Sequence, residues 1–226
     1  MSAPTPIVRV AAPMRQQVSD MLRKAIANGH FFPGQRLVER ELCASLKISR
    51  PLLREALRQL EAEGLIRAAA PRGLEVSRIT VEDARNIYVI RLALEGVATA
   101  GFVNCASPTQ LLALDAAVEA IEDAGNHHDK AAVHTNKNVF YEIILGGCGN
   151  PLLSEFLSSL HNRIQLLRGT SLSEPNRLSN TVKEIQAIHR AIKDKDAVQA
   201  QRACNQHIEN AARVTVQALE RQEEAM

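Results

Sequence analysis

Three neighbouring side chains in the N-terminal third of this sequence have the chemistry that contact with a nucleic acid duplex requires. Arg50 and Arg54 are four residues apart, so they share one face of any helix that contains both, and Ser49 stands directly before them. A guanidinium can bind two acceptors on the major-groove edge of guanine, or the oxygens of a phosphate. Arg40 adds a further cation upstream. These residue types and spacings predict a surface that contacts double-stranded DNA.

The surrounding residues predict the two helices that would carry this surface. Residues 39–46 form a short helix and residues 47–48 a tight connection. Ser49 then caps a second helix that runs to about Ala62. Gly64 stops that helix, because glycine reaches positive φ at low cost. The order of these parts predicts a helix-turn-helix with Arg50 and Arg54 on the exposed N-terminal face of its second helix.

A β-hairpin is expected directly after this second helix. Residues 65–67 and 74–76 are two short extended runs separated by a turn with Arg72 and Gly73 at its tip. A cationic hairpin tip beside a helix in the major groove suits contact with the minor groove or the backbone. The sequence therefore predicts a winged helix-turn-helix with a small β-hairpin wing.

Charge divides the chain into two parts. Residues 1–78 hold 13 lysines and arginines against 7 aspartates and glutamates, whereas residues 79–226 hold 14 against 18. This asymmetry is typical of a nucleic-acid module joined to another domain. We expect a flexible arm over residues 1–13, the DNA-binding domain over residues 14–78, and a helical effector-binding and dimerisation domain over residues 79–226.

Composition excludes several classes of protein. No apolar run approaches the ~20 residues of a membrane span, and no signal peptide begins the chain. The four cysteines are scattered without a CxxC pair, which indicates free thiols in a reducing cytoplasm. The sequence lacks a Ser/His/Asp arrangement, a glycine-rich phosphate loop and an HExxH motif. We therefore expect a cytoplasmic protein that is not an enzyme, with no cofactor and no membrane partner.

The remainder of the chain is predicted to be helical, so the fold class is mainly α with an all-α antiparallel bundle at the C-terminus. A first helix ends at Gly29, and Thr80 and Ser107 cap two further helices. Residues 169–180 are expected to form a loop. The C-terminal helices are expected at about residues 81–103, 111–124, 130–145, 152–168, 181–192 and 196–220.

These features resemble a known family. The ISRPLLREAL string at residues 48–57, with Pro33-Gly34, Gly64-Leu65 and Arg72-Gly73, resembles the winged helix of the GntR family of bacterial transcription regulators. The rest is similar to the FCD domain of its FadR subfamily, and six helices suit the VanR-like branch. The resemblance is carried there by Arg91, Leu94-Glu95, Phe140-Tyr141, Gly149-Asn150-Pro151-Leu152, Asp196-Ala197 and His207.

The resemblance implies particular DNA contacts. Arg40, Ser49, Arg50 and Arg54 would contact operator DNA, with Arg72-Gly73 as the wing tip. This chain departs from the family at Pro51-Leu52, where a hydroxyl residue and then a proline usually follow the arginine. One hydrogen-bond donor is lost, so the base preference is expected to differ from that of other members.

The resemblance also points to a site in the C-terminal domain. Many FCD domains bind a divalent metal through four ligands, whose positions fall here on Lys137, Tyr141, Ile185 and His207. An ammonium repels a metal and Ile185 cannot donate an electron pair. A metal site would therefore need His134 or His189 to rearrange, and we expect no bound metal.

An organic carboxylate fits these residues better than a metal. Lys137 would meet its charge, Tyr141 and His207 would donate hydrogen bonds, and Ile185 would wall the cavity. Arg91 is a further cation for the anion, and Arg177 in the preceding loop could close over it. We expect a homodimeric repressor that binds operator DNA under the control of a small organic anion. Two alternatives stay open: an effector-independent dimeric DNA-binding protein, and a metal-dependent regulator that uses His207.

Overall fold

The computed structural model describes residues 12–27, 31–69 and 73–224. The chain forms two compact units, residues 1–78 and residues 79–226, each of which is described by itself. Most of the arm expected at residues 1–13 lies outside the described residues. So does Gly29, where the first helix was expected to end.

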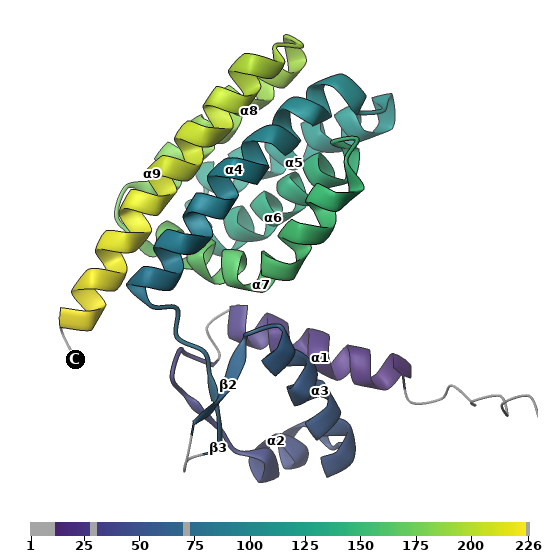
Figure 1. The fold of residues 1–226 in the computed structure, drawn as a ribbon, viewed down its shortest axis with the longest axis vertical. Helices are drawn as coiled ribbons and strands as arrows, with labels where there is room; N and C mark the ends of the chain where they lie inside the picture. The colour runs from purple at the N-terminus through teal and green to yellow at the C-terminus, as the bar shows by residue number, and fades with distance from the viewer. Residues whose placement is uncertain (1–11, 28–30, 70–72, 225–226) are drawn as a thin grey trace, which may run out of the picture. The chain divides into compact units, whose positions relative to one another are not determined.

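Within its described residues, the N-terminal unit contains three helices and a small sheet (Figure 1). Helix α3 (Arg50–Ala62) buries one apolar face, and α1 (Ala12–Ala27) packs against α3. The buried residues of α3 recur at the three- and four-residue spacing of one helix face, as the sequence predicted. They are Leu53, Ala56, Leu57 and Leu60.

Backbone conformation fixes the ends of the two helices of the helix-turn-helix. Helix α2 (Glu39–Leu46) ends at Lys47, which adopts the left-handed conformation with φ of 53°. Gly64 takes a φ of 72° directly after α3, as predicted. Ser49 occupies the N-cap of α3, but its side chain makes no capping hydrogen bond. The predicted role of its hydroxyl in capping is therefore wrong.

In the part of the chain that the structure describes, the sheet has three antiparallel strands in the order β1-β3-β2. Strands β2 (Ile66–Ala69) and β3 (Gly73–Val76) form the predicted wing. Strand β1 (Arg36–Leu37) was not predicted; it pairs with β3 through Leu37 opposite Leu74. Two residues are too few to show the alternation by which a strand is recognised, so only tertiary pairing reveals it.

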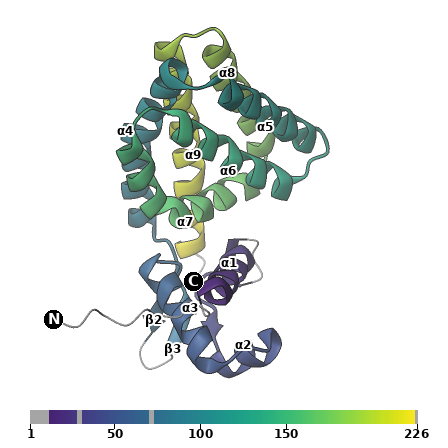
Figure 2. The same ribbon diagram turned by 90° about the vertical axis from the view of Figure 1, so that its right-hand side faces the viewer.

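The C-terminal unit is a bundle of six helices within its described residues. Figures 1 and 2 show α4 and α9 side by side, and the other helices complete the bundle. Thr80 and Ser107 both cap their helices as predicted, and each forms a capping box, with Asp83 and Gln110 respectively. The six helices are α4 (Val81–Cys105), α5 (Pro108–Asn126), α6 (Lys130–Gly147), α7 (Pro151–Ser173), α8 (Arg177–Lys193) and α9 (Ala197–Glu224).

The loop predicted at residues 169–180 is wrong. Helix α7 continues to Ser173 and α8 begins at Arg177, which leaves a connection of only three residues. Leu172 and Leu178 are buried on either side of this connection. Burial of these side chains in the bundle outweighs the weak helix propensity of the serines, threonine and glycine there.

Helix α4 would satisfy a membrane test by length and composition alone, with a mean hydropathy of 1.3 in its most apolar window. It nevertheless carries the charged side chains of Arg91 and Glu95, both buried within the bundle. Its apolar character is that of a core helix that packs along α9.

Candidate functional site

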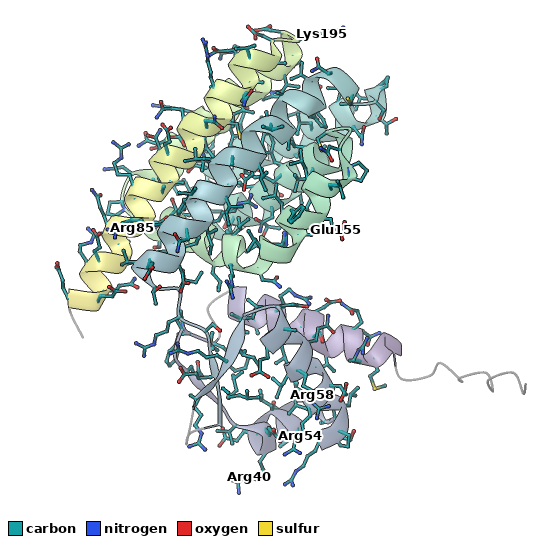
Figure 3. The ribbon with its side chains drawn as sticks, in the orientation of Figure 1. Arg40, Arg54, Arg58, Arg85, Glu155 and Lys195 are labelled. Atoms are coloured by element: carbon teal, nitrogen blue, oxygen red, sulfur yellow. The ribbon has the colours of Figure 1, made fainter. Side chains whose placement is uncertain are left out.

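The predicted DNA-contacting arginines are displayed on α2 and α3. Arg40 and Arg50 are exposed, and neither makes a hydrogen bond or ion pair with any residue that the structure describes. Arg54 is also exposed, and its Nε lies 3.0 Å from Glu39 Oε2. Figure 3 shows Arg40 and Arg54 together on one side of the N-terminal unit. The guanidinium of Arg54 is thus oriented by α2, whereas those of Arg40 and Arg50 are free to bind.

The remaining predicted contacts lie at the start of α3 and on the wing. Ser49 is exposed, and because its hydroxyl does not cap α3 it is available to an external partner. Gly73 has a φ of 87°, and a Cβ there would meet no atom within 4 Å. The wing tip at this position is therefore open to an approaching backbone. Arg72 lies outside the described residues.

Arg58, also on α3, has a local partner. Its Nη1 lies 2.5 Å from Glu55 Oε1, one helical turn earlier, and both side chains are exposed. Such surface pairs stabilise a helix by only ~0.3–0.5 kcal/mol. Arg58 therefore behaves as a solvated helix charge rather than as part of the free arginine surface.

In the C-terminal unit, all six predicted effector residues are buried. Three of them contact carboxylates: Arg91 donates two hydrogen bonds to Glu95, at 2.7 and 3.1 Å, Arg177 Nη2 lies 2.8 Å from Glu184 Oε2, and His207 also contacts Glu184. Arg177 begins α8 instead of lying in a loop, which corrects its expected position. The exposed fractions are 0% for Arg91, 1% for Lys137, 2% for Tyr141, 3% for Arg177 and 0% for Ile185 and His207.

Lys137 is the least compensated of these groups. No hydrogen bond or ion pair joins its ammonium to any described residue. Burial, and then the charges of Arg168, Arg91 and Arg177, lower the pKa of Lys137 well below its usual 10.5. A buried amine without a partner is costly to leave unsatisfied, so this position favours an anion.

His207 is neutral in this environment. Burial, and then the nearby Lys137, lower its pKa to about 3. Its Nδ1 lies 2.5 Å from Glu184 Oε2, so the neutral ring donates its one proton there. Nε2 is buried without a partner and acts as an acceptor in this tautomer. The prediction that His207 donates to a ligand therefore requires it to gain a proton.

One cation of this cluster, Arg168, was not predicted from the sequence. This side chain is 4% exposed, and its guanidinium carbon lies 4.1 Å from the centre of the Tyr141 ring. Its Nη1 donates to Asn138 Oδ1 at 2.8 Å, and Nη2 is 3.8 Å from Glu95 Oε1. The available signal was spacing, since Arg168 shares the buried helix face of Ile164.

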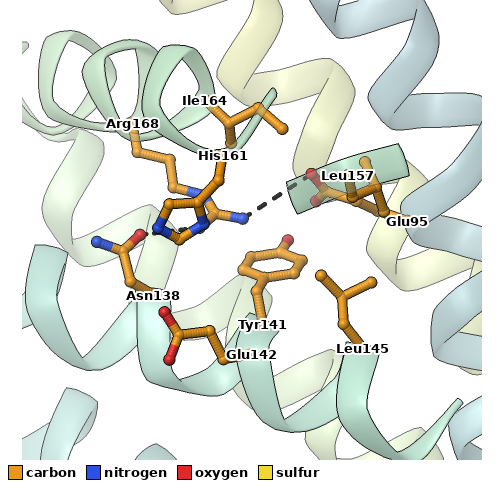
Figure 4. Close-up of a pocket in the computed structure, with 9 residues that line it drawn as sticks. All are labelled: Glu95, Asn138, Tyr141, Glu142, Leu145, Leu157, His161, Ile164 and Arg168. Atoms are coloured by element: carbon orange, nitrogen blue, oxygen red, sulfur yellow. Dashed lines mark hydrogen bonds and ion pairs between the residues drawn. The ribbon is translucent and has the colours of Figure 1, made fainter. Parts of the chain in front are cut away.

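A pocket opens beside Arg168 (Figure 4). Its cavity volume is about 20 Å³, which is room for about one water molecule. Of the six predicted effector residues, only Tyr141 lines it. Lys137 adjoins the lining residue Asn138 in sequence, but Lys137, Arg91 and the residues of α8 and α9 lie outside the lining. The lining residues are Glu95, Asn138, Tyr141, Glu142, Leu145, Leu157, His161, Ile164 and Arg168.

The donor set does not suit a metal ion. Within the described part of the chain, no three His, Cys, Asp or Glu side chains are grouped so that they could hold one. His134 and His189, the two histidines that might have supplied missing ligands, are engaged elsewhere. His134 Nε2 lies 3.0 Å from the carbonyl oxygen of Gln165, and His189 Nε2 lies 2.5 Å from Asp115 Oδ1.

Removal of metal is therefore expected to leave the protein unchanged. Treatment of the purified protein with a chelator should shift neither its melting temperature nor its affinity for DNA, because Lys137 and Ile185 occupy positions where ligands would be needed. Differential scanning calorimetry with elemental analysis tests this expectation. A near-stoichiometric transition metal, lost to the chelator together with stability, would contradict it.

Comparisons with known proteins agree with this two-part architecture. Residues 14–76 match the gntR family of bacterial regulatory proteins, and residues 86–210 match the FCD domain. The chain is 29% identical over 198 residues to the uncharacterized HTH-type transcriptional regulator YdhC of Bacillus subtilis, which covers 87% of this chain and 86% of that protein. It is 26% identical over 148 residues to the regulator McbR of Escherichia coli, with 66% and 67% covered.

Solved structures share the fold. A transcriptional regulator GntR from Rhodococcus sp. RHA1 superposes with a TM-score of 0.79 at 23% identity, covering 91% of this chain and 99% of that one. The E. coli McbR/YncC structure gives a TM-score of 0.79 at 22% identity, covering 90% and 97%. Relatives at this level are transcription regulators rather than enzymes. The chain therefore belongs to the GntR family of bacterial transcription regulators, with an FCD domain as its C-terminal unit.

Proposed function

We propose that this regulator is a cytoplasmic repressor that binds a palindromic operator as a homodimer and is released by a small organic acid bound in its helical unit. The observation that carries the proposal is the buried cationic cluster formed by Arg91, Lys137, Arg168 and Arg177. Within the described residues only two carboxylates, Glu95 and Glu184, pair with it. An acid bound among these cations would offset their mutual repulsion.

Repression is supported by a relative that matches part of the chain. The chain is 36% identical over 83 residues to the HTH-type transcriptional repressor RspR of E. coli, which covers 37% of this chain and 36% of that protein. The four cysteines are all free, which suits a reducing cytoplasm where the operator would also lie.

A homodimer is supported by an exposed apolar stripe on α4. Ile90 and Val97 are two helical turns apart on one face, and Val89 adjoins them; their exposed fractions are 39%, 47% and 66%. We assign this stripe to the same helix of a second copy, because a two-fold interface pairs one patch with itself. Two recognition helices would then reach successive turns of the major groove.

The proposed release mechanism requires the acid to distinguish two dimer arrangements. A ligand that binds both arrangements equally shifts neither population. A ~100-fold difference in affinity, about 2.7 kcal/mol, is enough to move a balanced equilibrium away from the operator-binding arrangement.

The operator and dimer parts of this proposal are tested with selected DNA. A binding sequence obtained by selection from random duplexes is expected to be palindromic, and fluorescence anisotropy should show at least ~100-fold tighter binding to it than to an isolated half-site. A control duplex with a scrambled half-site should resemble the isolated half-site. Equal affinity for the palindrome and the half-site would mean that the protein does not bind as a dimer.

A further inference from the structure

The interior of the helical unit has an excess of positive groups. Four cationic side chains, Arg91, Lys137, Arg168 and Arg177, are each no more than 4% exposed. Their carboxylate partners among the described residues are Glu95 and Glu184. When all four cations are protonated, two positive charges remain uncompensated. Buried charges are normally paired, so this excess indicates a missing anionic partner.

The excess can be assigned to two side chains. Arg91 and Arg177 each have a carboxylate within 2.8 Å. Arg168 donates to the neutral amide of Asn138 and is 3.8 Å from Glu95, which is already held by Arg91. Lys137 has no hydrogen-bond or ion-pair partner among the described residues. Arg168 and Lys137 are therefore the two cations without a carboxylate of their own.

Unpartnered polar atoms surround the same region. Arg91 Nη1, Arg168 Nε, the Tyr141 hydroxyl and His207 Nε2 are all buried, and each lacks a hydrogen-bond partner within the described part of the chain. Tyr141 links them, since its ring lies under Arg168 and its centroid is 6.4 Å from that of His207. These atoms come from α4, α6, α7 and α9, so a ligand that satisfied them would contact four helices at once.

The pocket of Figure 4 reaches two of these groups, Arg168 and Tyr141, and supplies an apolar wall. Arg168, Asn138 and Tyr141 form its polar side, and its apolar residues suit a short hydrocarbon segment. The two carboxylates of the lining do not cancel this preference: Glu95 is neutralised by Arg91, and Glu142 is exposed, where solvent screens it. Its cavity volume of about 20 Å³ holds about one water molecule, so a larger ligand must widen the pocket on binding. The apolar lining residues are Leu145, Leu157 and Ile164.

We propose that the effector of this regulator is a compact dianion, with one negative charge bound by Arg168 at the pocket and the second by Lys137 behind it. This inference rests on the proposed function and specifies the ligand class of the same site. Two kinds of molecule share this chemistry: a short dicarboxylate and a phosphate monoester of similar size. Titration with matched members of each series distinguishes between them.

The test compares ligands that differ by one charge at nearly constant shape. Isothermal titration of the full chain at pH 7 would use succinate, glutarate and adipate, each beside its monoamide, and propyl and butyl phosphate, each beside its methyl ester. We expect at least one dianion to bind at least ~10-fold more tightly than its matched monoanion, the effect of one charge-assisted hydrogen bond. The series that shows this preference identifies a carboxylate or a phosphate as the source.

Variants connect the preference to the two cations. Lys137→Met and Arg168→Met should each reduce the ratio of dianion to monoanion affinity to near one, whereas Lys183→Met, an exposed position on α8, should leave the ratio unchanged. Lys137→Gln and Arg168→Gln provide the same measurement if a methionine variant does not fold. A ratio does not depend on the fraction of folded protein, so lost stability alone cannot imitate this result.

Two outcomes separate failure of this inference from failure of the proposed function. If the monoanions bind as tightly as their matched dianions, the two-charge inference is overturned and an acid-responsive regulator remains. If no member of either charge class binds, the proposed acid effector is itself overturned, and the dianion inference with it.

Discussion

Replacing Lys137 with methionine is expected to weaken effector binding by roughly 10- to 100-fold, since a charge-assisted hydrogen bond contributes about 1.5–3 kcal/mol. The same change should raise the free energy of unfolding by on the order of 1–3 kcal/mol, because it removes a buried amine without a partner and keeps most of its apolar length. Titration calorimetry and chemical denaturation measure the two effects. Higher stability together with weaker effector binding would show that Lys137 serves binding. A lysine with only a structural role would lose stability when it is replaced.

The pH dependence of binding provides an internal check on this lysine. In the free protein, burial and then Arg168, Arg91 and Arg177 lower the pKa of Lys137, whereas Glu95 acts in the opposite direction. A bound anion stabilises the ammonium and raises that pKa again. At a pH between the pKa of Lys137 in the free protein and its higher pKa in the complex, binding takes up a proton. Effector affinity therefore falls by up to tenfold for each pH unit as the pH rises through this window. His207, with a pKa of about 3, is neutral there in the free protein.

Lys137→Met should lose this pH dependence together with the affinity. Lys183→Met is the matched control, because it makes the same chemical change at an exposed position of α8. Unchanged affinity of Lys137→Met for an acid that binds the wild type would show that this lysine takes no part in the site.

Arg50→Ala is expected to weaken operator binding by about 10- to 100-fold for each half-site, since a bidentate contact to a base is worth about 1–3 kcal/mol. Arg50 is exposed at the start of α3 and makes no ion pair among the described residues, so its loss creates no unpaired charge within the protein. Affinity for scrambled DNA should fall much less, because that binding depends on the total positive charge. Anisotropy titrations with both duplexes measure the difference.

Arg190→Ala, on the exposed surface of α8, is the charge-matched control and should leave both affinities unchanged. Equal losses on operator and scrambled DNA in Arg50→Ala would indicate a phosphate contact instead of a base contact. Identical behaviour of Arg50→Ala and wild type would remove Arg50 from the contact surface.

Local chemistry explains which parts of the fold could be predicted from the sequence. The capping boxes at Thr80 and Ser107 and the limits of α2 depend on residues within a few positions of one another. Strand β1 depends on pairing with β3, which lies more than 30 residues later in the sequence, so no local sequence pattern predicts it. The break between α7 and α8 was misplaced because burial of Leu172 and Leu178 prevailed over local propensity.

In the candidate site, too, features that depend on nearby residues or on family resemblance were predicted, and features that depend on contacts between helices were not. Lys137 and Tyr141 were found through the resemblance to the FCD family, whose metal-ligand positions fall on them, and they share one face of α6. Arg168 was missed because its importance comes from Tyr141, Asn138 and Glu95, which lie on other helices. The ion pair between Arg177 and Glu184 was missed for a similar reason. Both residues belong to α8, but Arg177 was predicted to lie in a loop and Glu184 in the following helix.

The most direct test of the account is the affinity of the wild-type protein for its selected operator with and without a saturating acid that titration shows to bind. The account predicts a loss of operator affinity of about 100-fold in the wild type. At the same acid concentration, Lys137→Met should show little or no loss. An acid that binds the helical unit while leaving operator affinity unchanged would contradict the central claim that the buried cations couple an effector to DNA binding.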